Sequence, residues 1–131
     1  MNMMSSWFFH SRSIHMALSI NMEDHYSYTL VELAGKVDSS TAELLDRTLE
    51  TAIVEGHRDL ILDCKQLLAI NSQGLRILLR ALKGYSVFYS LTLCNVSNPI
   101  RALLDLTGIS RFTVIRDNLD QAAASIPDSH F

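Results

Sequence analysis

The sequence is poor in the features that mark disulfide-bonded, membrane-spanning or nucleic-acid-binding chains. Its only two cysteines, Cys64 and Cys94, are far apart and lack the spacing of metal ligands. We therefore expect them to be small buried apolar side chains in a reducing compartment. No apolar run is long enough to span a bilayer. The net charge of −3 gives no reason to expect a nucleic acid as partner.

The motifs of common enzyme sites are also missing. There is no glycine-rich phosphate loop, no nucleophile elbow and no metal-ligand cluster. Asp38 and Asp63 lie at expected turn edges, where each is explained as a cap or turn residue, because no cleft for acid–base chemistry can be inferred. We expect no catalytic residue, no cofactor and no metal. Five histidines are scattered over expected turns and tails and are interpreted as surface residues: His10, His15, His25, His57 and His130.

The first fifteen residues lack the periodicity of the rest of the chain. The apolar residues 7–9 are too few for the core of a signal peptide, and no convincing small-residue cleavage site follows, so a cytoplasmic location is expected. We interpret residues 1–15 as a flexible leader, 16–126 as one folded domain and 127–131 as a polar tail. Met16 is an alternative start of translation.

The first part of the domain has the pattern of a hairpin followed by a helix. Apolar residues alternate over 17–22 and again over 26–34, which predicts two antiparallel strands, and Gly35 breaks the second. Ser40 and Glu43 have the spacing of a capping box. The helix that follows is expected to end near Gly56 and to carry an apolar stripe formed by Leu44, Leu45, Leu49 and Ile53.

The central stretch, residues 59–82, combines a strand and an amphipathic helix. The continuous apolar run 60–62 closes on Asp63 and predicts a strand buried on both faces of a sheet, with a helix covering each face. From residue 75 the apolar positions recur with a period near 3.6, which predicts a helix that begins at about Ser72, with Asn71 as N-cap. Its basic residues share one face, which is either solvated or fits an acidic partner surface: Arg76, Arg80 and Lys83.

The segment 84–90 is open to two interpretations. It either begins one long strand or ends the preceding helix, which leaves a strand over 91–94; ordinary element lengths favour the second. Further helices are expected after Pro99 and over 119–126, with a short strand over 112–115. The order β-β-α-β-α-β-α-β-α predicts an α/β fold: a mostly parallel sheet with an N-terminal antiparallel strand and helices packed against it.

Ser72 is the residue of greatest functional interest. It is expected on a surface corner, in the first turn of a helix, where another protein can reach it. A phosphate there would meet free backbone N–H groups and the positive end of the helix dipole, so the fold would tolerate the charge while the surface seen by a partner changed. The simpler interpretation, which composition alone favours, is that Ser72 is only part of the cap.

The order of elements and four segments together resemble the STAS domain, specifically the bacterial anti-sigma factor antagonists. The segments are residues 35–42, 60–63, 71–75 and 95–97, and the resemblance covers about residues 17–126. The most telling motifs are the Gly-x-x-Asp before the first helix and the Asp-Ser-x-Gly-like turn before the second.

The resemblance implies a function. In that family, the serine of this turn is phosphorylated by a partner kinase that is also an anti-sigma factor, and a metal-dependent phosphatase reverses the reaction; the matching residue here is Ser72. Unphosphorylated protein would bind the kinase and free what the kinase held, and phosphorylation would release it. ATP and metal would belong to the partners, and this chain would not be an enzyme. The implied partner-binding residues are Asp38, Asn71, Ser72, Gln73, Gly74 and Arg76.

The sequence departs from the family pattern at two positions. Asn71 stands where an aspartate is usual, and Gln73 where a second serine or threonine is common. The neutral Asn71 keeps the capping role but removes a charge beside the phosphoacceptor, so either the choice of partner is retuned or Ser72 is not phosphorylated.

Three hypotheses therefore stand. The first is a phosphorylation-switched antagonist that regulates transcription through partner switching. The second is a non-switched STAS interaction or scaffold domain in a signalling assembly or transporter complex, for which Ser72→Asp would leave binding unaffected. The third, a small enzyme, ranks last because the sequence offers no convergent titratable groups.

Overall fold

The computed structural model describes residues 10–14, 17–56, 58–85 and 89–126. Within these residues, a six-stranded sheet has the spatial order β1-β2-β3-β4-β5-β6. The two pairs β1/β2 and β2/β3 are antiparallel, and the other three pairs are parallel. The strands are β1 (His10–Ile14), β2 (Leu18–Asp24), β3 (Tyr28–Val37), β4 (Asp59–Ile70), β5 (Leu91–Cys94) and β6 (Val114–Arg116). The predicted α/β class is therefore correct.

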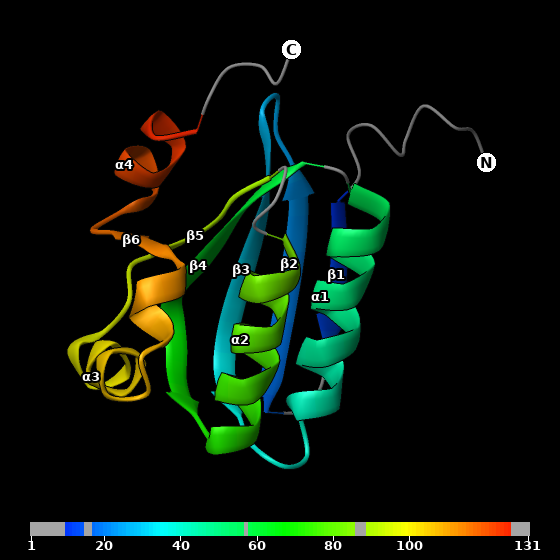
Figure 1. Ribbon diagram of the computed structural model, residues 1–131. Coiled ribbons are helices and arrows are strands. Elements are labelled where there is room, and N and C mark those ends of the chain that lie inside the picture. Colours follow the sequence, from blue (N-terminus) through cyan, green and yellow to red (C-terminus); the bar gives the residue numbers. More distant parts are fainter. Residues whose placement is uncertain (1–9, 15–16, 57, 86–88, 127–131) are drawn as a thin grey trace.

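Four α-helices are described, with a short 3-10 helix between the last two. They are α1 (Ala42–Gly56), α2 (Ser72–Tyr85), α3 (Asn98–Leu106), the 3-10 helix η2 (Ile109–Phe112) and α4 (Leu119–Ala124). In Figure 1, α1 and α2 lie side by side in front of the sheet, and α4 lies near β5 and β6. No helix among the described residues combines the length and the apolar character needed to cross a bilayer.

The core is divided by the sheet. Leu60 and Leu62 of β4 belong to the larger apolar cluster, together with residues of α1, α2 and α3. Ile61 points the other way and packs in a smaller cluster with Ala122 and Ile126 at α4. Because successive side chains of a strand point to opposite faces, this is the arrangement that the continuous apolar run predicted.

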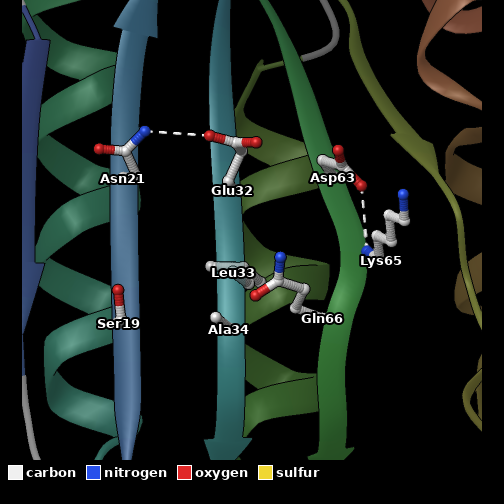
Figure 2. A pocket seen from close by; sticks show the side chains of 8 residues that line it. All are labelled: Ser19, Asn21, Glu32, Leu33, Ala34, Asp63, Lys65 and Gln66. Atoms are coloured by element: carbon white, nitrogen blue, oxygen red, sulfur yellow. Dashed lines mark hydrogen bonds between the residues drawn. The ribbon is translucent and has the colours of Figure 1, made fainter.

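α4 packs on the face of the sheet opposite α1 and α2. We call the part of this face formed by polar residues of β2, β3 and β4 the open face. Leu18 and Ile20 are buried in the large cluster, so the alternate residues Ser19 and Asn21 face away from α1 and α2. Figure 2 views the sheet from this face, with helices behind the strands. The residues that define it are Ser19, Asn21, Glu32, Ala34, Asp63 and Gln66.

Several predicted elements are confirmed. The hairpin is β2 and β3, and Leu45 and Leu49 of the α1 stripe are buried. The expected break at Gly35 is wrong, because β3 continues through this residue to Val37 and stays paired with β4. The second interpretation of residues 84–90 holds, since α2 continues to Tyr85 and β5 begins at Leu91.

Three element predictions are wrong. The leader was expected to be a flexible extension, but His10–Ile14 forms β1, which pairs through its main chain with β2 and so needs no apolar pattern. The strand after residue 59 does not stop at Asp63 or Cys64; it continues to Ile70, because pairing with β3 resumes after irregularities in the register. Phe112 lies in η2, and the last strand begins at Val114.

The predicted capping box is also wrong. Ser40 does not cap the N–H of Glu43; instead its hydroxyl donates to Asp38 Oδ1 at 2.7 Å. The helix begins at Ala42, and Leu45 N–H donates to the carbonyl of Thr41. Asp38 organises this turn in place of the box, by accepting from both the N–H and the hydroxyl of Ser40.

Candidate functional site

The carboxyl ends of β3 and β4 place two predicted site segments at one corner. Val37 and Ile70 are register partners in the parallel pair β3/β4. The N–H of Asn71 donates to the carbonyl of Val37 at 2.9 Å, which joins the start of α2 to the end of β3. Asp38 directly follows Val37, so the turn before α1 and the turn before α2 form one surface, which we call the α2 corner: Asp38, Asn71, Ser72, Gln73 and Arg76.

Asn71 has the predicted capping role. Its side-chain oxygen accepts from the N–H of Gly74 at 2.9 Å, and its carbonyl accepts the first intrahelical bond, from Leu75. This satisfies one of the N–H groups that the first turn of a helix leaves free. Ser72 and Gln73 are the first two residues of α2 and both are exposed. A partner protein can therefore reach the hydroxyl of Ser72.

Gly74 lies beneath this surface rather than on it. The residue is buried, and a Cβ built on it would lie 2.6 Å from Val37 Cγ1 and 2.7 Å from Ile70 Cγ1. The first turn of α2 therefore packs its backbone directly against the ends of β3 and β4. Its role in partner binding remains a prediction, but its structural role is to allow this close approach.

The carboxylate of Asp38 is held by its own turn. It accepts from the Ser40 hydroxyl at 2.7 Å and from the Ser40 N–H at 2.9 Å, with the Thr41 hydroxyl at 3.4 Å. These bonds, first that from the Ser40 hydroxyl, lower the pKa of Asp38 below its ordinary value. A lowered pKa stabilises the fold above the unfolded-state pKa, and that contribution is lost as pH falls through the folded-state pKa. The same bonds hold the Asp38 carboxylate in one position at the α2 corner.

The basic residues of α2 divide into two kinds. Arg80 pairs with Asp46 of α1, and the Lys83 amino group lies 5.2 Å from the centre of the Phe112 ring. Arg76 is exposed and makes no hydrogen bond or ion pair with any residue that the structure describes. Because residues four apart on a helix are neighbours, Arg76 is the cation closest along α2 to Ser72.

Other residues considered from the sequence do not join this corner. Asp63 lies within β4, not at a turn edge, and its side chain accepts from the Asn95 amide. Cys64 and Cys94 are unpaired and buried, and burial raises the pKa of each thiol to about 12. His25 stacks on Tyr28. In the described ranges, no three His, Cys, Asp or Glu side chains gather as metal ligands would.

Removing the Asn71 cap is expected to weaken the fold modestly. Asn71→Ala leaves the Gly74 N–H without its acceptor and should lower the free energy of unfolding by about 1 kcal/mol. Asn71→Asp keeps an oxygen there and adds a charge that the helix dipole favours, so it should be at least as stable as the parent. Urea unfolding measures all three proteins, with Gln73→Ala as an exposed control; equal losses in Asn71→Ala and Gln73→Ala would contradict the capping role.

Comparison with known proteins agrees with this architecture. The chain is a small α/β domain. It has α1 and α2 on one face of the sheet and a capped turn at the end of β4. The family model described as the STAS domain matches residues 19–122. The chain belongs to the STAS domain family.

Similar proteins and solved structures align with most of this chain. An anti-sigma F factor antagonist of Paenibacillus polymyxa is 30% identical over 105 residues, which are 79% of this chain and 90% of that protein. The crystal structure of an anti-sigma factor antagonist from Mycobacterium paratuberculosis has a TM-score of 0.79 at 21% identity, over 87% of this chain and 97% of that one. The phosphorylated form of the Bacillus cell fate determinant SpoIIAA has a TM-score of 0.62 at 19% identity, over 80% of this chain and 96% of that one. The two structural likenesses concern the fold.

Proposed function

We propose that this chain is an anti-sigma factor antagonist that works by partner switching. While Ser72 is unphosphorylated, the α2 corner binds a serine-protein kinase that is also an anti-sigma factor; phosphorylation of Ser72 releases the partner. The observation that carries the proposal is the exposed hydroxyl of Ser72 in the first turn of α2, next to the turn of Asp38. The name of the Paenibacillus relative, an anti-sigma F factor antagonist, supports the general role.

The α2 corner surrounds the neutral hydroxyl of Ser72 with polar groups that a partner could contact. Asp38 offers a carboxylate to a basic group of the partner, and the hydrogen bonds from Ser40 that lower its pKa also hold it in place. Gln73 adds an exposed amide, and Arg76 an exposed guanidinium. A closely fitted partner surface would exclude water from Ser72. A neutral hydroxyl can be buried there at low cost, whereas a charged group could not.

A phosphate on Ser72 would be tolerated by this chain but would destabilise its complex with the partner. It adds about −1.5 to −2 charge, which the positive end of the α2 dipole and the guanidinium of Arg76 both favour. The partner would meet this charge beside Asp38, and the repulsion and the cost of desolvating the phosphate would oppose the complex.

The reaction itself would take place on the partner. ATP and its metal would be bound by the kinase, and a separate metal-dependent serine phosphatase would restore the hydroxyl. This chain would supply the phosphoacceptor and the binding surface and would act in the cytoplasm, with no nucleic acid bound and no insertion into a membrane. Its output would be transcription, through the sigma factor that the kinase releases.

Asn71 is compatible with this scheme in spite of its neutrality. The family's usual aspartate would accept the Gly74 N–H, and Asn71 does the same through its amide oxygen. The local geometry around Ser72 is thus retained while one negative charge beside the phosphoacceptor is absent, which we expect to retune the choice of kinase rather than remove the site.

An intact-mass assay with the candidate kinase and ATP tests the proposal. The parent chain should gain the mass of one phosphate and Ser72→Ala should gain none, while Ser39→Ala, a matched exposed serine at the same corner, should behave as the parent. Phosphorylated protein should bind the kinase at least about tenfold more weakly than unphosphorylated protein, since roughly 1.4 kcal/mol of repulsion is enough for that factor.

Two results would contradict the proposal, the first for the site and the second for switching itself. A mass gain that persists in Ser72→Ala would place the phosphoacceptor elsewhere. No gain in any variant, with tight kinase binding that Ser72→Asp leaves unchanged, would mean a constitutive interaction domain in a signalling assembly or transporter complex.

A further inference from the structure

A polar pocket lies on the open face of the sheet, away from α1 and α2. Its volume is about 200 Å³ and it is formed by two adjacent cross-strand rows of β2, β3 and β4. One row is Asn21, Glu32 and Asp63, which are consecutive register partners. The next is Ser19, Ala34 and Gln66, also register partners, and the small side chain of Ala34 leaves the middle of this row hollow.

The β3/β4 register is irregular at this point. Glu32 pairs with Asp63, but Ala34 pairs with Gln66, so β4 has one residue more than β3 between the two rows. Lys65 and Gln66 are consecutive and both exposed, which regular alternation would not allow. Such a bulge redirects side chains, and here it places both at the rim of the pocket.

The first row sets two carboxylates directly opposite each other on neighbouring strands. Like charges in this position repel, and this arrangement is destabilising unless a cation lies between them. The Lys65 ammonium forms an ion pair with neither Glu32 nor Asp63, and Figure 2 shows its side chain projecting on the far side of β4. Among the residues whose side chains the structure describes, 17–56, 58–85 and 89–126, none supplies that cation.

Both carboxylates keep accepting capacity that the protein does not use. Glu32 accepts from the Asn21 amide through Oε1 at 2.9 Å. Asp63 accepts from the Lys65 N–H and from the Asn95 amide, both at 3.0 Å and both through Oδ1. The thiol of Cys94 also hydrogen-bonds to the Asp63 carboxylate. The second oxygen of Glu32 accepts no hydrogen bond from a residue whose side chain the structure describes. Asp63 is only 8% exposed and lines the pocket, and its three donors leave part of the accepting capacity of its two oxygens unused.

We propose that this pocket binds a small organic cation with N–H donors, a primary ammonium or a guanidinium, with its charged head between Glu32 and Asp63. The head donates to the second oxygen of Glu32 and to the unused accepting capacity of the Asp63 carboxylate, in charge-assisted bonds that also offset the repulsion between the two acids. The body of the ligand lies over Ala34, where Ser19 and Gln66 offer further polar contacts. An organic cation fits better than a bare metal ion, because two carboxylates that already accept hydrogen bonds are few ligands for a metal and the hollow over Ala34 has room for carbon atoms.

The test is isothermal titration calorimetry of the full unphosphorylated chain at neutral pH and low salt. The probes are methylguanidinium and putrescine, with tetramethylammonium as a cation that has no N–H donor, and magnesium chloride. Methylguanidinium or putrescine should bind saturably with one-to-one stoichiometry. Tetramethylammonium and magnesium should show no saturable binding.

Isosteric variants assign the site. Glu32→Gln retains an oxygen for Asn21, and Asp63→Asn retains one for the Lys65 N–H and the Asn95 amide, so each removes a charge while keeping these hydrogen bonds. Each should weaken binding about tenfold or more, the value of one charge-assisted hydrogen bond. Glu50→Gln, an exposed acid of α1 on the opposite side of the sheet, should bind as the parent does.

Three outcomes would overturn the proposal. The first is no saturable binding of either N–H probe up to about 10 mM, a concentration that reveals even weak specific sites. The others are equal affinities of the probe for the parent and for Glu32→Gln, and tighter binding of magnesium than of either N–H probe. If Asp63→Asn does not fold, Glu32→Gln alone decides. The assay contains no kinase and no ATP, so its result is independent of the function proposed for Ser72.

Discussion

Replacing Gly35 with alanine should lower the free energy of unfolding by about 3 kcal/mol or more, which combines backbone strain with a steric clash. Gly35 has φ +113°, a conformation that residues with a Cβ rarely adopt, and the added Cβ would lie 2.1 Å from the carbonyl oxygen of Ala17. That same oxygen accepts from the N–H of Lys36 at 2.8 Å. The clash therefore cannot be relieved without breaking the bond that joins the ends of β2 and β3.

Urea unfolding followed by circular dichroism measures this loss. Gly84→Ala is the matched control, because its Cβ would meet nothing within 4 Å and the position lies in α2. Alanine in a helix is favoured over glycine by about 1 kcal/mol, so this control should be more stable than the parent. If Gly35→Ala unfolds at the same urea concentration as the parent, the close approach to Ala17 is not maintained in solution.

Replacing Gly74 with alanine should cost about 2–3 kcal/mol of stability and should also weaken binding of the partner kinase. The new Cβ would overlap Val37 and Ile70, two branched side chains that are buried at the ends of β3 and β4. Neither is the far end of a flexible chain, so the first turn of α2 has to move outward. That movement displaces Ser72 together with the Asn71 cap.

Stability and binding can be separated for this variant. Its affinity for the kinase is measured at a temperature where circular dichroism shows it to be fully folded, beside Gly56→Ala, whose Cβ would meet nothing within 4 Å. Gly56→Ala, at the last residue of α1, should match the parent in affinity and be no less stable. A Gly74→Ala protein as stable as the parent would show that α2 does not pack its backbone against the strands.

The parts of the fold that follow from local periodicity could be predicted from the sequence. The alternation in β2 and β3 and the helical period from Leu75 onward reflect which face of each element is buried, and this is recorded in consecutive residues. β1 and the second half of β4 could not be predicted in this way. β1 is formed by main-chain pairing with β2, which requires no particular pattern of side chains. In β4, the bulge at Lys65 and Gln66 breaks the alternation that would have indicated a strand.

The candidate site shows the same division. Asn71 could be assigned as the cap of α2 because capping depends on residues three positions apart. The steric role of Gly74 depends on Val37, which lies on another strand, and nothing near Gly74 in the sequence indicates it. The pairing of Glu32 with Asp63 likewise depends on the register between β3 and β4. A signal for it would require knowing which residues of two distant strands are opposite each other.

The two buried thiols have a practical consequence for studying this protein. With a pKa of about 12, each is almost wholly protonated at neutral pH, and the protonated form reacts poorly with maleimides and iodoacetamide. Because Cys64 and Cys94 are the only cysteines in the chain, the natural protein is already suited to site-specific labelling. A cysteine placed at the exposed position of Gln73 would carry a fluorophore beside Ser72, where its emission would report each arrival and departure of a partner in real time.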